Sequence, residues 1–258
     1  MNNQMIIKLK PNKISFATSE AIKMLRANIQ FSGYKIKAVS VISFHPNEGK
    51  SFISYELALS LAEQGKKTIY VDCDLRKSVM QARLKISTHL SNLTEYLCGN
   101  KTADEIIYDT ENPCLSMIFA GIGSPNPSEL LSEDLFDELC AKLKDEYDYI
   151  VFDTTPIGSV IDGAIVSQKC NGTVIVIESG GTDRSDAIRM KNQLETANAN
   201  VLGVVVNKVG IGNSGYYYPY YKKHGYGYYG KHHKGRYGYG QYGRYGYGQY
   251  GNNGRKGV

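Results

Sequence analysis

The sequence is poor in cysteine and has no long apolar run. Its five cysteines are widely spaced over 258 residues and none forms a Cys-x-x-Cys pair, which argues against a disulfide framework and a structural zinc site. No stretch approaches the roughly 18 to 20 consecutive apolar residues that a membrane-spanning helix needs. The N-terminus contains no apolar core of the kind that signal peptides carry. We therefore expect a cytoplasmic protein with reduced thiols.

Acidic residues are absent from the end of the chain. After Lys208 there is no aspartate or glutamate, and the lysines and arginines there contribute +8, so the net charge of +5 leaves −3 for the preceding part. The stretch 215–258 is rich in glycine and lacks leucine, isoleucine and phenylalanine, so it cannot bury enough apolar surface to fold alone. We predict an irregular lead-in over 1–17, a folded domain over 18–209 and a flexible tyrosine-rich tail over 210–258.

Segments of strand character alternate with segments of helical character in the predicted domain. Apolar and β-branched runs predict strands over 39–42, 67–74, 115–120, 150–152, 173–177 and 201–206. Amphipathic patterns predict short helices within 92–110 and longer helices over 19–31 (capped by Ser19), 53–62, 128–146 and 183–197. This alternation indicates right-handed βαβ crossovers, and the nearly continuous apolar strands fit a parallel sheet covered by helices on both faces. We predict an α/β fold.

The stretch 39–51, VSVISFHPNEGKS, joins a predicted strand to a predicted helix through a loop that ends in Gly-Lys-Ser. This is the context of a phosphate-binding loop, because the unpaired N–H groups at a helix N-terminus attract phosphate oxygens. In that interpretation Lys50 reaches the β- and γ-phosphates and the hydroxyl of Ser51 binds Mg²⁺. The usual eight-residue pattern has glycine where this chain has Phe44, so a simple helix start with a solvated lysine stays an alternative.

Three aspartates follow apolar strands. Asp72 and Asp74 end the second predicted strand, with Arg76 just beyond, and Asp153 ends the strand over 150–152. The carboxyl ends of parallel strands form the ligand-binding edge of such a sheet, and alternating side-chain direction sends Asp72 and Asp74 to the same side. Asp153 could hold a Mg²⁺-bound water there. Helix capping and turn formation are the alternative roles for these acids.

Several motifs coincide in this chain. They are His-Pro-Asn-Glu-Gly-Lys-Ser at 45–51, Asp-Cys-Asp-Leu-Arg-Lys at 72–77, Ser-Pro-Asn-Pro-Ser-Glu-Leu-Leu at 124–131, Asp-Thr-Thr-Pro at 153–156 and the tyrosine cluster of the tail. In this combination, over residues 15–250, the chain resembles the bacterial tyrosine kinases of capsule and exopolysaccharide synthesis, in their Gram-positive form with a separate membrane activator. That family has a P-loop NTPase-like fold. Asn47 replaces a glycine of the family's loop, and asparagine tolerates a positive φ better than most residues.

The resemblance implies an ATP-dependent protein-tyrosine autokinase that uses Mg²⁺. It implies nucleotide contacts from Asn47, Glu48, Gly49, Lys50, Ser51, Phe52 and Asn207, the last of them at the adenine. It implies catalytic roles for Lys50, Asp72, Asp74 and Arg76, with Asp72 as the proton acceptor, and metal roles for Ser51, Asp72 and Asp153. The phosphate acceptors would be the tail residues Tyr216, Tyr217, Tyr218, Tyr220, Tyr221, Tyr226, Tyr228, Tyr229, Tyr237, Tyr239, Tyr242, Tyr245, Tyr247 and Tyr250.

The resemblance also implies partners. Glu20, Lys23 and Arg26 resemble the family's Glu-x-x-Arg-x-x-Arg subunit-contact motif, with a lysine in place of the first arginine, and they imply a homo-oligomeric ring. A membrane-anchored activator would recruit the protein to the inner face of the membrane, and a cognate phosphotyrosine phosphatase would reverse the modification. No nucleic-acid partner is expected.

Two other functions stay open at this point. Partition and cell-division ATPases share the fold and the acidic motifs, but they resemble one another through an additional lysine near the start of the loop, where this chain has Ser43, Phe44 and His45. A non-enzymatic scaffold is the second alternative, because basic residues interleaved with aromatic ones can stack on RNA bases. Phosphotyrosine formed from labelled ATP would separate the kinase from both.

Overall fold

The computed structural model describes residues 6–9, 13–121 and 126–210. Internal contacts divide the chain into two units, 1–209 and 210–258, and the fold below is that of the first. The tail tyrosines predicted as phosphate acceptors lie outside the described residues, as do the first two residues of the Ser-Pro-Asn-Pro motif. No helix in the described ranges is long and apolar enough to cross a membrane.

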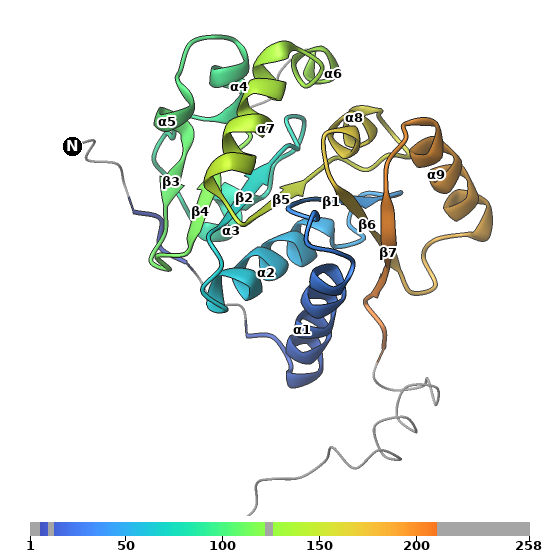
Figure 1. The fold of residues 1–258 in the computed structure, drawn as a ribbon. Coiled ribbons are helices and arrows are strands. Elements are labelled where there is room, and N and C mark those ends of the chain that lie inside the picture. Colours follow the sequence, from blue (N-terminus) through green and yellow to red (C-terminus); the bar gives the residue numbers. More distant parts are fainter. Residues whose placement is uncertain (1–5, 10–12, 122–125, 211–258) are drawn as a thin grey trace, which may run out of the picture. The chain divides into compact units, whose positions relative to one another are not determined.

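A seven-stranded sheet runs through the unit in the order β3-β4-β2-β5-β1-β6-β7 (Figure 1). Neighbouring strands are parallel except β3 and β4, which pair antiparallel at one edge. The strands are β1 Ala38–Ser43, β2 Thr68–Asp72, β3 Tyr108–Asp109, β4 Leu115–Ile118, β5 Tyr149–Asp153, β6 Gly172–Glu178 and β7 Val201–Asn207. The α/β prediction with a mostly parallel sheet is confirmed.

The described helices flank this sheet (Figure 1). They are α1 Phe16–Phe31, α2 Lys50–Glu63, α3 Met80–Leu84, α4 Leu93–Leu97, α5 Ala103–Ile106, α6 Pro127–Leu130, α7 Asp134–Glu146, α8 Asp162–Gln168 and α9 Arg184–Thr196. The short helices α3 and α8 have no counterpart in the sequence prediction.

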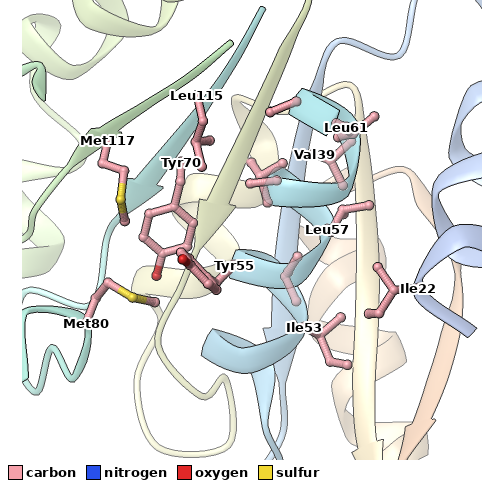
Figure 2. Packing of buried hydrophobic residues seen from close by; sticks show 14 of the residues in the cluster. Ile22, Val39, Ile53, Tyr55, Leu57, Leu61, Tyr70, Met80, Leu115 and Met117 are labelled. Atoms are coloured by element: carbon pink, nitrogen blue, oxygen red, sulfur yellow. The ribbon is translucent and has the colours of Figure 1, made fainter. Parts of the chain in front are cut away.

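Successive residues of the central strands enter different hydrophobic clusters. On β2, Tyr70 belongs to a cluster with α1 and α2, whereas Ile69 and Val71 belong to a cluster with α7. Figure 2 shows the first cluster, with Leu57 of α2 over the sheet. Because both faces of the strand are covered, no position needs a polar side chain facing water, which explains why the strands are apolar almost throughout.

Two boundaries differ from the sequence prediction because polar side chains bond locally. The helix predicted to begin at Ser19 begins at Phe16, since the Oγ of Ser15 accepts a hydrogen bond from the backbone N–H of Thr18 at 3.1 Å and so caps it. The strand predicted to reach residue 74 ends at Asp72, whose Oδ1 accepts a hydrogen bond from the backbone N–H of Asp74 at 3.1 Å. The predictions placed these boundaries three and two residues too late.

The helix predicted over 128–146 is two helices, α6 and α7, separated near Ser132. The hydroxyl of Ser132 donates to the carbonyl oxygen of Ser128 at 2.7 Å, which closes the first helix. The segment predicted as short helices contains α4 and α5 and then the edge strand β3, at Tyr108 and Asp109. A strand this short has no periodicity that a sequence pattern can reveal.

Candidate active site

The loop between β1 and α2 is held by the buried side chain of Glu48. Its Oε2 accepts hydrogen bonds from the backbone N–H groups of Phe44 and His45, both at 2.8 Å. Its Oε1 accepts one from the backbone N–H of Glu178, the last residue of β6, at 3.4 Å, and one from the hydroxyl of Thr182, between β6 and α9. Glu48 was predicted to contact a nucleotide, and its carboxylate braces the loop from inside.

Two residues of the loop adopt left-handed backbone conformations. Asn47 has φ +66° and Gly49 has φ +99°. A Cβ at Gly49 would lie 2.1 Å from the Nδ2 of Asn207, because the amide of Asn207, at the end of β7, donates to the carbonyl oxygen of Glu48 at 2.8 Å. Asn207 was predicted to contact adenine, and the structure places its amide on the loop itself.

Lys50, the first residue of α2, turns its side chain into the protein. Its Nζ lies 3.3 Å from Oδ2 of Asp74 and 3.9 Å from Oδ1 of Asp153. Burial alone would lower the pKa of the Lys50 ammonium, but the carboxylates of Asp153, Asp74 and Asp72 raise it above its ordinary value. Lys50 is only 9% exposed, so the alternative of a solvated lysine at a simple helix start is wrong.

Register brings two of the predicted acids side by side. Asp72 of β2 is the direct partner of Asp153 of β5 in the parallel ladder. The Oδ2 of Asp72 accepts a hydrogen bond from the hydroxyl of Ser78 at 2.6 Å. Asp74, two residues on, faces Lys50 from the loop after β2. The three carboxylates and the ammonium therefore form one buried cluster at the carboxyl edge of the sheet.

This cluster makes stability depend on pH. Burial, with a further contribution from the like charge of Asp153, raises the pKa of Asp72 to about 8. In the unfolded chain an aspartate titrates near 3.9. The folded protein therefore holds a proton that the unfolded chain releases, and the stability gained is full below about pH 4 and lost as the pH rises through about 8.

We expect the free energy of unfolding of the metal-free protein to fall between about pH 5 and about pH 8, and Asp72→Asn to flatten that fall. Urea unfolding in the presence of a chelator, at several pH values for both proteins, measures it. Parallel profiles for wild type and variant would contradict the expectation.

The donor atoms of the cluster fit Mg²⁺. The Oδ2 of Asp153 accepts a hydrogen bond from the phenol of Tyr70 at 2.9 Å, whereas its Oδ1 is buried and accepts none. The Ser51 hydroxyl lies 3.4 Å from the Lys50 ammonium at the same place. Mg²⁺ binds through hard oxygens, with one or two carboxylates completed by substrate phosphates and water. The described residues accordingly hold no all-protein cage of three or more histidine, cysteine or acidic side chains.

Comparison with known proteins identifies the family of this chain. The family model described as "AAA domain" matches residues 36–182. "Tyrosine-protein kinase CpsD" of Streptococcus agalactiae is 40% identical over 192 residues, which are 74% of this chain and 84% of the relative. The chain belongs to the bacterial tyrosine-protein kinases. The resemblance seen in the sequence is thus confirmed.

Solved structures agree with this kinase family. The kinase domain of the Escherichia coli tyrosine kinase ETK is 25% identical with a TM-score of 0.69, over 82% of this chain and 88% of that one. The septum site-determining protein MinD of Pyrococcus horikoshii, solved with Mg-ADP, is 20% identical with a TM-score of 0.58, over 67% and 71% of the two chains. The likeness to MinD shows the fold alone.

Arg76 of the kinase is exposed but pairs with a buried carboxylate of its own chain. Its Nε and Nη2 donate to the two oxygens of Asp162, at 2.6 and 3.1 Å, and Asp162 also accepts the hydroxyl hydrogen bond of Ser128 at 2.5 Å. Asp162 is buried at the start of α8. A bidentate pair of this kind fixes the plane of the guanidinium, so the phosphate role predicted for Arg76 would require it to act from this position or to leave Asp162.

The three residues predicted to contact another subunit make different contacts within this chain. Glu20 and Lys23 pair with each other on α1 at 2.7 Å, with both side chains partly exposed. Arg26 instead donates to the carbonyl oxygen and the hydroxyl of Ser60 on α2, at 2.8 and 2.9 Å. Arg26 thus fastens α1 to α2 within one chain, and a role in a ring stays a prediction.

Three residues that hold the kinase site were not predicted: Tyr70, Ser78 and Asp162. Tyr70 carried a usable signal, because a hydroxyl inside an otherwise apolar strand needs a buried partner. Ser78 and Asp162 carried none, since their partners depend on how loops fold back. Phe52, predicted beside the nucleotide, lies in the first turn of α2 with the guanidinium of Arg83 5.1 Å from its ring centre.

Proposed function

We propose that this kinase transfers the γ-phosphoryl group of ATP to tyrosine hydroxyls in its own residues 210–258. The observation that carries the proposal is the buried Lys50 ammonium at the end of the phosphate loop, facing Asp74 and the Oδ1 of Asp153, an oxygen that accepts no hydrogen bond. A regulatory ATPase that transfers no phosphoryl group to tyrosine would also need Lys50 to bind its nucleotide. The tyrosine-rich segment gives the chain a substrate of its own.

Each part of phosphoryl transfer is assigned to particular residues of the chain. The N-terminus of α2 and the loop before it bind the phosphates, with Lys50 on the β- and γ-oxygens. Ser51, Asp153 and Asp72 would hold Mg²⁺, which would neutralise phosphate charge when bound. The tyrosine oxygen attacks the γ-phosphorus, the bond to the bridging oxygen breaks, ADP leaves, and the phenolic proton passes to Asp72.

The tail suits this role by composition. A flexible segment of about 40 residues spans roughly 35 Å, and tethering gives an effective concentration on the order of millimolar. Each phosphate adds about −1.5 to −2 charges, so about five would cancel the tail's +8. Phosphorylation thereby reverses the attraction of the tail to an acidic partner or membrane surface.

We propose the partners by analogy with the family. A membrane-anchored activator recruits the kinase to the inner face of the membrane, copies of the chain assemble into a ring, and a phosphotyrosine phosphatase resets the tail. The cycle controls capsule or exopolysaccharide synthesis.

Labelling with γ-labelled ATP and Mg²⁺ tests the proposal. The wild type is compared with a variant in which the tail tyrosines of 216–250 are phenylalanine, each with and without the cytoplasmic segment of the membrane partner. We expect phosphotyrosine in peptides of the tail of the wild type and loss of most label in the variant.

Other results select other functions. ATP hydrolysis without phosphotyrosine identifies a switch of the partition class, and RNA binding without ATP use identifies a scaffold. Label that persists in the phenylalanine variant places the acceptor elsewhere in the chain.

A further inference from the structure

Asp153 accepts its hydrogen bond from a different kind of donor than the other two carboxylates of the site. Asp72 and Asp74 each accept a hydrogen bond from a backbone N–H of the loop that follows β2, at 3.1 and 2.9 Å. Asp153 ends its strand, and its Oδ2 accepts a hydrogen bond from the side chain of Tyr70 at 2.9 Å. Its Oδ1, also buried, is left without a hydrogen bond.

Tyr70 reaches Asp153 from the neighbouring strand. It lies on β2 two residues before Asp72, which pairs with Asp153 in register. The whole residue is inaccessible to solvent, and its ring packs in the cluster beneath α2 (Figure 2). A hydroxyl buried this deeply is costly unless it is hydrogen-bonded. The hydrogen bond from Tyr70 to Oδ2 of Asp153 meets this need and also restrains the carboxylate.

We propose that Tyr70 is a positioning residue for the metal. By holding Oδ2 of Asp153, Tyr70 fixes the carboxylate so that Oδ1 faces Lys50 and is available to Mg²⁺ or a water bound to it. This inference rests on the proposed function, because it assumes a metal–nucleotide complex at the site. Groups that orient a metal-binding side chain typically change metal affinity by about 10- to 100-fold when removed.

Tyr55 provides a matched control. It lies on α2 with its ring centre 6.3 Å from that of Tyr70, at an interplanar angle of 80° (Figure 2). It is equally buried, but its hydroxyl has no hydrogen-bond partner. Tyr55→Phe therefore removes the same atom from the same cluster as Tyr70→Phe, without loosening Asp153.

The experiment is a Mg²⁺ titration of nucleotide binding. A fluorescent ADP analogue is added to the full chain, and the Mg²⁺ concentration at half-maximal binding is measured for wild type, Tyr55→Phe and Tyr70→Phe after their thermal unfolding has been recorded. We expect Tyr70→Phe to raise the midpoint by roughly 10-fold or more, and Tyr55→Phe to stay within about twofold of wild type.

A double-variant comparison shows whether Tyr70 acts through Asp153. Adding Tyr70→Phe to Asp153→Asn is expected to leave the Mg²⁺ midpoint of Asp153→Asn unchanged, because the carboxylate that Tyr70 orients is gone. This comparison also serves if Tyr70→Phe alone does not fold, since the amide leaves no uncompensated buried charge.

Two outcomes overturn the inference in distinguishable ways. Equal midpoints for wild type and Tyr70→Phe, or a further shift in the double variant, overturn the role of Tyr70 and leave the kinase proposal intact. A wild type that binds no nucleotide at any Mg²⁺ concentration overturns the proposed function and the inference with it.

Discussion

Replacing Lys50 with methionine is expected to lower phosphotyrosine formation by about 10²- to 10³-fold, the usual effect of removing one preorganised charge at a transition state. The side chain keeps its length but loses the ammonium that faces Asp74 and Asp153. Phosphoryl transfer depends almost entirely on positioning and charge neutralisation, so little else can compensate. Initial rates with labelled ATP, in the presence of the activator segment, measure the effect.

Lys66→Met is the control for this substitution. Lys66 is exposed in the turn after α2, so its replacement removes a charge of the same sign without touching the cluster. Rates for Lys66→Met should match wild type. If Lys50→Met retained more than about a tenth of the wild-type rate, Lys50 would not carry the transfer.

Gly49→Ala is expected to weaken nucleotide binding by at least 10-fold and to lower the free energy of unfolding by about 2 to 3 kcal/mol. Two costs add. An alanine at φ +99° is strained, and its Cβ would lie 2.1 Å from the Nδ2 of Asn207. The amide must therefore move and release the carbonyl oxygen of Glu48. Calorimetric binding of Mg-ADP and urea unfolding give the two numbers.

Gly65→Ala separates the two costs. Gly65 also has a positive φ, +78°, but a Cβ there meets nothing within 4 Å. We expect only the conformational cost, about 1 to 2 kcal/mol, and unchanged nucleotide binding. Equal effects of Gly49→Ala and Gly65→Ala on Mg-ADP affinity would mean that the Asn207 contact is irrelevant to the loop.

Much of the fold and of the site could be predicted because local patterns encode it. A strand that runs into Gly-Lys-Ser and a helix identified the loop, and the acids that end β2 and β5 identified the edge of the sheet. The alternation of strands and helices indicated a parallel sheet. It did not indicate that β2 and β5 are neighbours, which is what places Asp72 beside Asp153.

What sequence patterns missed depends on contacts between distant residues or on a few local hydrogen bonds. The carboxylate of Glu48 bonds the hydroxyl of Thr182, 134 residues later, and no spacing rule anticipates that. At the break between α6 and α7 the hydroxyl of Ser132 bonds the carbonyl oxygen of Ser128, a local contact that helical periodicity does not reveal. The pairing of Arg76 with Asp162 requires α8, a helix too short to show an amphipathic repeat.

The bond between Asn207 and the loop also orders events during synthesis. Its two ends are 159 residues apart. The ribosome therefore releases the loop and α2 long before this hydrogen bond can form. Nascent chains tend to fold from the N-terminus as they emerge, and the early part can form strands without a finished phosphate cradle. We therefore expect the loop to reach its final geometry for ATP only after β7 has joined the sheet.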